Sequence, residues 1–259
     1  MGRKKGTVAS TIHPFLKILL DDGRSWMDPA AEAAKKGVHS RKREEFKLSL
    51  GGHYRYQVFG YASRLTELPE QLRVVATFIQ HRPTGRAFKK LGIRRGEYVS
   101  YHYRNYVVLL QTALDVAVRL TGETLALGLK PRDMNHNTVV ENVWTERWGL
   151  KPTLQNLEKV TAPFKKVRNE LIHAGESPHI EQTQEINLIE AAQTMGEDPP
   201  TWLSEQELDA AFNAACNELV EQITGQAKDL TDAISAHLTE LQRPYAHWAR
   251  RLDAEWRSK

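Results

Sequence analysis

Arg168, Asn169 and His173 bring three chemically useful side chains into six consecutive residues of the chain. A histidine can donate or accept a proton near neutral pH. An arginine can bind phosphate oxygens and stabilise the negative charge of a transition state, and an asparagine can orient the histidine or the phosphate by hydrogen bonding. On a helix, Asn169 and His173 would share a face, and the long Arg168 side chain would have to wrap toward the imidazole.

This combination suits RNA cleavage without a metal ion. The 2′-hydroxyl of the RNA attacks the neighbouring phosphate, so the protein does not have to supply a nucleophile. Arginine and histidine at similar spacing also occur at Arg95 and His102. Of these two arginines, only Arg168 is followed directly by Asn, Asp or His. The structural alternative is a surface ion pair between Arg168 and a nearby glutamate, with His173 as a residue that merely ends the helix.

Basic and aromatic residues near this motif and in an earlier segment are candidates for RNA binding. Lys165 and Lys166 precede the motif by about one turn and would hold phosphates, unless they are ordinary exposed lysines. His102 and Arg104 lie in the run Tyr101–Tyr106, whose rings could stack on bases. A tyrosine stripe at helical spacing is, however, more often part of a hydrophobic core.

Other familiar catalytic patterns are missing from the sequence. It has no Gly-rich phosphate loop, no dinucleotide fingerprint, no His-Glu-x-x-His zinc motif and no paired cysteines, so we expect neither a cofactor nor a metal. The single cysteine, Cys216, is expected to fill the core, and it indicates a reducing, cytoplasmic setting. No apolar run approaches the roughly 20 residues of a transmembrane helix, so we expect no membrane partner.

The spacing of apolar residues predicts a mainly α-helical protein, in which amphipathic helices form an antiparallel bundle. Pro163 should either kink one helix or open another. Ser204 and Glu207 have the spacing of a capping box at the start of the longest helix. The expected helices run from about 65 to 83, from 98 to 120, from 152 to 173, from 204 to 244, and from 245 to 256.

The chain divides into three expected parts. Residues 1–64 form a basic extension, in which alternating apolar residues on both sides of Gly51-Gly52 predict a small β-hairpin. Residues 65–245 form the helical bundle, and residues 246–259 form a tail helix.

Charge also divides the chain. Residues 1–120 carry 22 Lys or Arg against 10 Asp or Glu, which is +12, whereas residues 181–259 carry 6 against 15, which is −9. The basic part suits a polyanion such as RNA or DNA, unless the acidic part neutralises it. Residues 82–97 are expected to form a basic connector, and residues 176–203 a polar insert. We expect residues 82–104 and the two lysines before the motif to form the RNA approach. The acidic residues should then lie on the opposite surface or meet the basic extension.

The run Arg168–His173 resembles the Arg-polar-x-x-x-His motif of the HEPN superfamily (higher eukaryotes and prokaryotes nucleotide-binding domains). The run Tyr101–Tyr106 is similar to the first bundle helix of some prokaryotic members. The resemblance covers roughly residues 65–245, and it implies a bundle of four or five helices that forms a homodimer with two motifs in one cleft. Many members are metal-independent endoribonucleases in toxin–antitoxin, antiphage or CRISPR-linked systems.

The resemblance implies roles for individual residues. Arg168 and His173 would be the catalytic pair and Asn169 the supporting polar residue, and an antitoxin or other regulatory protein would be a possible partner. Because other members keep the bundle without catalysis, the main alternative is a non-catalytic module that binds RNA or nucleotides or regulates a partner. A DNA-binding protein that uses the basic extension is a weaker alternative, since that segment offers no recognition helix.

Overall fold

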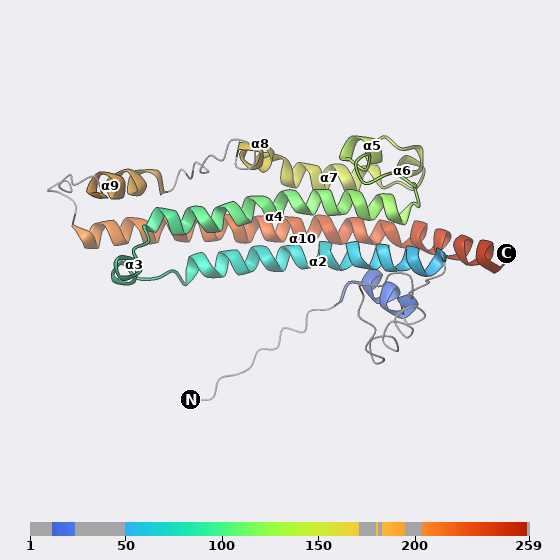
Figure 1. The fold of residues 1–259 in the computed structure, drawn as a ribbon, viewed down its shortest axis with the longest axis horizontal. Coiled ribbons are helices and arrows are strands. Elements are labelled where there is room, and N and C mark those ends of the chain that lie inside the picture. Colours follow the sequence, from blue (N-terminus) through green and yellow to red (C-terminus); the bar gives the residue numbers. More distant parts are fainter. Residues whose placement is uncertain (1–11, 24–49, 171–179, 181–182, 195–203, 258–259) are drawn as a thin grey trace, which may run out of the picture. The chain divides into compact units, whose positions relative to one another are not determined.

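The computed structural model describes residues 12–23, 50–170, 180, 183–194 and 204–257. Every regular element in these ranges is a helix, which confirms the all-α bundle (Figure 1). Besides a helix over residues 14–23, the elements are α2 (Leu50–Gln80), α3 (Gly85–Leu91), α4 (Arg95–Thr124), α5 (His136–Val140), α6 (Val143–Arg147), α7 (Lys151–Thr161), the 3-10 turn η2 (Ala162–Phe164), α8 (Lys165–Asn169), α9 (Gln184–Thr194) and α10 (Glu205–Arg257).

The chain forms two compact units, and the long helices α2, α4 and α10 contribute to both. The first unit comprises residues 1–64, 117–151 and 235–259, and the second comprises residues 65–116 and 152–234. The motif residues Arg168 and Asn169 belong to the second unit. No helix in the described ranges is long and apolar enough to cross a membrane.

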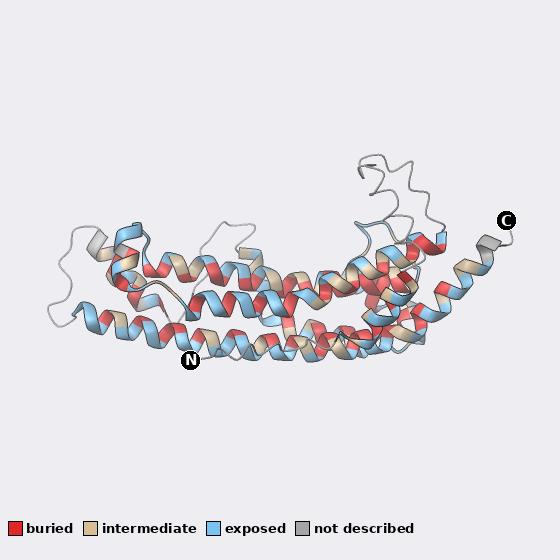
Figure 2. Ribbon diagram, turned by 90° about the horizontal axis from the view of Figure 1, so that it is seen from below, coloured by how far each residue is buried: buried red, intermediate tan, exposed pale blue. Residues whose placement is uncertain are grey.

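The core of the second unit follows the helical spacing of its apolar residues. Buried and exposed residues alternate every three or four positions along each long helix (Figure 2), so one face of each helix is removed from water. Burying a leucine or phenylalanine side chain stabilises the fold by about 1.5–3 kcal/mol. This core includes Leu65, Leu68, Leu72 and Ile79 of α2, Val99, Tyr106 and Leu110 of α4, Leu154 and Leu157 of α7, and Leu208, Phe212, Leu219, Ile223 and Leu230 of α10.

The core of the first unit centres on Tyr245 of α10. Its ring stacks on Tyr54 of α2 at 5.7 Å and meets Phe15 edge-on at 5.5 Å. The Tyr54 hydroxyl donates to the carbonyl of Thr124 at the end of α4 (2.9 Å). Aromatic contacts of this kind add about 0.5–1.5 kcal/mol each to the burial of the rings, so they hold these elements together.

The expected β-hairpin is wrong where the structure describes it, because residues 50–58 form the first turns of α2. Tyr54 and Val58 are buried and Tyr56 is exposed, which is the spacing of a helix and not of a strand. A Cβ at Gly51 would lie 2.5 Å from the Asp253 carboxylate. Gly51 therefore serves a close approach of α2 and α10, and not a hairpin turn.

The longest helix continues through Pro244, so the expected tail helix is the last part of α10. A proline inside a helix costs about 3 kcal/mol, because it removes one backbone hydrogen bond and its ring crowds the preceding turn. Leu241 and Tyr245 are buried on either side of Pro244, and this packing offsets the cost. Residues 184–194, which the sequence assigns to a polar insert, form α9.

Candidate functional site

Two glutamine side chains fix the end of α7, just before the motif. Helix α7 ends at Thr161, and carbonyl groups in the last turn of a helix lack helical partners. Gln111 of α4 donates to the Thr161 carbonyl (2.6 Å), and Gln226 of α10 donates to the Val160 carbonyl (2.7 Å). These bonds join α7 to α4 and to α10 at the point where the chain turns toward the motif.

The turn η2 connects this anchor to α8. Its Phe164 is buried and meets Tyr106 of α4 edge-on at 5.1 Å. Pro163 stands in the first turn of η2, so of the two expectations for this proline the second holds: it opens a new helical segment. The short helix α8 therefore starts from a fixed position on α4.

Helix α8 carries four of the residues that the sequence selects. Arg168 is half-buried and Asn169 is exposed, and Nη1 of Arg168 donates to Oδ1 of Asn169 (3.4 Å). Lys165 and Lys166 are exposed. The structure thus brings Arg168 and Asn169 into contact, whereas His173 lies outside the described residues.

The ion pair of Arg168 with a nearby glutamate, considered from the sequence, is not the pair that Glu170 forms. Glu170 pairs with Lys166 at 3.7 Å on the exposed face of this segment. An exposed pair at helical spacing contributes only about 0.3–0.5 kcal/mol. Of the motif residues that the structure describes, Arg168 and Asn169 are the two that contact each other through a side-chain hydrogen bond.

His102 and Arg104 have contrasting environments on α4. The His102 side chain is buried, and its ring stacks on Phe78 at 5.3 Å and meets Tyr98 at 4.5 Å. Burial lowers the pKa of His102, so the ring is neutral at pH 7 and packs between aromatic side chains. Arg104 and Tyr101 are exposed, so they present a cation and a ring to the solvent.

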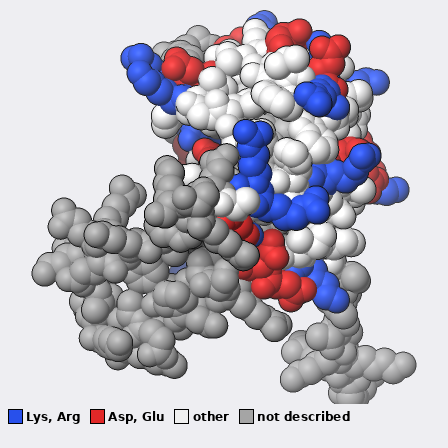
Figure 3. All heavy atoms as spheres, turned by 90° about the vertical axis from the view of Figure 1, so that its right-hand side faces the viewer, with Lys and Arg blue, Asp and Glu red and all other residues white. Residues whose placement is uncertain are grey.

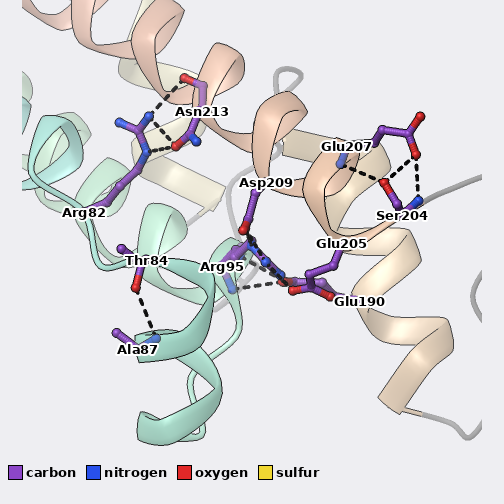
Figure 4. Close-up of polar contacts among 11 residues, drawn as sticks. Arg82, Thr84, Ala87, Arg95, Glu190, Ser204, Glu205, Glu207, Asp209 and Asn213 are labelled. Atoms are coloured by element: carbon purple, nitrogen blue, oxygen red, sulfur yellow. Dashed lines mark hydrogen bonds and ion pairs between the residues drawn. The ribbon is translucent and has the colours of Figure 1, made fainter.

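A buried cluster around Arg95 was not anticipated from the sequence, which assigns this residue to a basic connector. Figure 4 shows three carboxylates from α9 and α10 converging on its guanidinium. Burial lowers the pKa of Arg95, but the hydrogen bonds to Glu205, Asp209 and Glu190 outweigh it and leave the pKa above its ordinary value. The donor–acceptor distances are 2.9 Å to Glu190, 2.8 Å to Glu205 and 3.1 Å to Asp209.

Further polar contacts hold the start of α10 in the same region (Figure 4). Ser204 and Glu207 form the expected capping box, with the Ser204 hydroxyl accepting from the Glu207 N–H (3.2 Å) and Glu207 accepting from the Ser204 N–H (2.7 Å). Arg82 donates from Nε (2.9 Å) and Nη2 (2.7 Å) to the Asn213 side chain. Cys216 is fully buried, and burial raises its pKa to about 11, so it remains a neutral thiol in the core.

These contacts neutralise part of the basic connector. Arg94 pairs with Glu97 at 2.6 Å, and Arg95 pairs with residues of the acidic part of the chain. On the face shown in Figure 3, Lys and Arg side chains lie beside Asp and Glu side chains and do not form one continuous basic surface. The separation of positive and negative charge along the sequence is therefore reduced in the folded chain, because distant segments of opposite charge meet.

Comparison with known proteins agrees with this architecture. The model of the HEPN_Cthe2314-like HEPN family matches residues 59–236, about two thirds of the chain. No curated protein and no solved structure matches the chain. The match confirms the resemblance inferred from the sequence, and it spans the anchored α7–η2–α8 segment. The chain belongs to the HEPN_Cthe2314-like HEPN family.

Proposed function

We propose that this chain is a metal-independent endoribonuclease. The observation that carries the proposal is the contact of Arg168 with Asn169 on the anchored helix α8 of a HEPN chain. An arginine that is half-buried and held by a neighbouring amide loses less side-chain freedom when it binds a phosphate. Arg168 would hold the oxygens of the scissile phosphate, and Asn169 would keep its guanidinium in place.

The reaction would proceed by attack of the RNA on itself. A bond forms between the 2′-oxygen and phosphorus, the bond from phosphorus to the 5′-oxygen breaks, and the products end in a 2′,3′-cyclic phosphate and a 5′-hydroxyl. The proton of the 2′-hydroxyl leaves and the 5′-oxygen gains one, and His173 would carry out one or both transfers. Arg168 would stabilise the additional negative charge on the phosphorus centre.

Cleavage in EDTA tests this proposal. Purified protein should cut mixed RNA in the presence of EDTA, and Arg168→Ala and His173→Ala should each reduce the rate by at least about a hundredfold, since each removes acid–base or electrostatic stabilisation of the transition state. Arg119→Ala, which removes an exposed arginine from α4, outside the motif, is the control and should cut at the parental rate. Products ending in a 2′,3′-cyclic phosphate would identify the 2′-hydroxyl as the nucleophile.

Other outcomes decide against catalysis. Equal residual cleavage in the parent and in both variants would identify a contaminating nuclease. RNA binding without any cleavage would favour the non-catalytic module. If cleavage is found, growth arrest on expression that both variants abolish would support a toxin or defence role in the cytoplasm, restrained by a regulatory protein.

A further inference from the structure

The end of α7 is held by hydrogen bonds from three side chains. The Thr161 hydroxyl donates to the carbonyl groups of Leu157 (3.0 Å) and Glu158 (3.2 Å), so its bonds stay within α7. The other two donors, Gln111 and Gln226, belong to α4 and α10. Carbonyl groups near a helix end otherwise depend on water or on a cap. The two glutamines are therefore the donors that can fix the place of this helix end relative to other helices.

Both glutamine amides are partly or wholly removed from water. Gln111 is buried, as is Thr161, whose carbonyl it binds at 2.6 Å. Gln226 is half-buried and binds the Val160 carbonyl at 2.7 Å. A buried carbonyl that loses its donor is destabilising, so the end of α7 stays where both amides can reach it. The place of this helix end consequently depends on α4 and α10 together.

The backbone between this helix end and the motif stays helical. Thr161, Phe164 and Lys165 have right-handed helical dihedral angles, and the Lys165 N–H donates to the Ala162 carbonyl. Helix α8 follows without a break and carries Arg168. Because a hydrogen-bonded helical segment moves as one body, a shift of the end of α7 would carry Arg168 with it.

The ring contact of this segment with α4 has a different part in holding it. Phe164 is buried against Tyr106, with 5.1 Å between the ring centroids. Contacts between aromatic rings tolerate a range of distances and angles, whereas a hydrogen bond weakens steeply with distance and misalignment. Phe164 therefore keeps the segment on α4, and the hydrogen bonds from Gln111 and Gln226 set its orientation.

We propose that Gln111 and Gln226 are positioning residues, which hold the guanidinium of Arg168 where it meets the scissile phosphate. They act through the end of α7, η2 and α8, and they do not touch the RNA. A displacement of about 1 Å at a reacting group can reduce a rate about a hundredfold, so small shifts of this helix end matter. This inference rests on the proposed function, because the contact of Arg168 with the phosphate belongs to that proposal.

Hydrogen exchange of the full chain tests the hold on α8 without any cleavage. Gln226→Met keeps a side chain of similar length and removes the donor to the Val160 carbonyl. The backbone amides of residues 165–170 should then exchange about threefold to tenfold faster than in the parent, as expected for the loss of one hydrogen bond. Gln222→Met makes the same substitution at an exposed position one turn earlier on α10, and these amides should exchange in it at the parental rate.

Cleavage kinetics test the effect on Arg168. Gln111→Met and Gln226→Met should each lower kcat about tenfold or more and leave KM within about twofold, because a misplaced guanidinium weakens an interaction made mainly in the transition state. Ile79→Val is the control for stability. It removes one buried methylene group from α2, which destabilises a fold to about the same extent as one lost hydrogen bond, and it should cut at the parental rate.

The outcomes separate this inference from the proposed function. Faster exchange of α8 in the two glutamine variants, in a parent protein that does not cut RNA, would support the positioning of Arg168 and contradict catalysis. Parental exchange of α8 in both variants would overturn the inference, whether or not the parent cuts RNA. Cleavage that depends on Arg168, with the same kcat in the glutamine variants as in Ile79→Val, would overturn the inference and leave the proposed function intact.

Discussion

His237 of α10 lies in a fully buried site in the first unit. The Thr121 hydroxyl donates to the Ala117 carbonyl (2.8 Å), so its oxygen accepts from Nε2 of His237 (2.9 Å), and this ring nitrogen carries the proton. Burial lowers the pKa of His237 to about 4. The folded protein therefore keeps this imidazole neutral over a pH range in which an exposed histidine is charged.

We expect stability to fall on mild acidification because of this residue. Between the ordinary histidine pKa of 6.5 and the folded value of about 4, the unfolded chain binds a proton that the folded chain does not. The contribution of the neutral His237 to the free energy of unfolding therefore has its full value above pH 6.5. It is lost as the pH falls toward 4, by about 3 kcal/mol in total. Urea unfolding at a series of pH values measures this loss.

His237→Gln removes the titrating group and provides the comparison. Carboxylates also affect acid stability, but they are common to both proteins, so the difference between the two unfolding free energies isolates the histidine. This difference should shrink as the pH falls from about 7 to 5. A constant difference would show that His237 is protonated in the folded protein as readily as in the unfolded one.

At the scale of helices, Arg95 and its neighbour Arg94 form a natural matched pair. The Arg95 side chain is 5% exposed and holds Glu190 of α9 and two carboxylates of α10. The Arg94 side chain, just before α4, is 48% exposed and pairs with Glu97 in the first turn of α4. Removal of the partner of a buried charge costs about 3–5 kcal/mol, whereas exposed pairs contribute about 0–1 kcal/mol.

Arg95→Ala should therefore destabilise the protein by several kcal/mol more than Arg94→Ala. The physical reason is that Glu190 would remain buried without its cation. Thermal or denaturant unfolding of the two variants measures the difference. Glu190→Gln in the Arg95→Ala background should recover part of the loss, because it removes the unpaired charge. Similar stability of the two arginine variants would mean that water reaches Glu190 and screens it.

The helices show which parts of the fold are predictable from the sequence. The long amphipathic helices are predicted well, because burial of one face follows a local period of 3.6 residues. The Gly51-Gly52 pair is misread, because the close approach of Asp253 from the far end of the chain leaves no local pattern. Pro244 is likewise misread as a helix end, since the packing of its buried neighbours keeps α10 continuous.

At the scale of the whole molecule, we expect a homodimer, because the proposed cleft would contain the motifs of two copies. Light scattering should give about twice the 29.5 kDa of one chain. Heterodimers of one parental and one His173→Ala copy should retain less than half of the parental cleavage rate, because their cleft would hold one histidine in place of two. A rate of one half would indicate two independent sites, and a monomeric mass would exclude the shared cleft.

The sequence by itself determines the helical class and the family resemblance, because both depend on residues close together in the chain. Only the tertiary structure decides which charges remain accessible. The sequence assigns Arg95 to the basic connector, yet its partners lie 95 to 114 residues away. His102 is buried while Arg104, two residues later, is exposed. Burial and ion pairing depend on distant segments that meet only in the folded chain, and no local spacing encodes them.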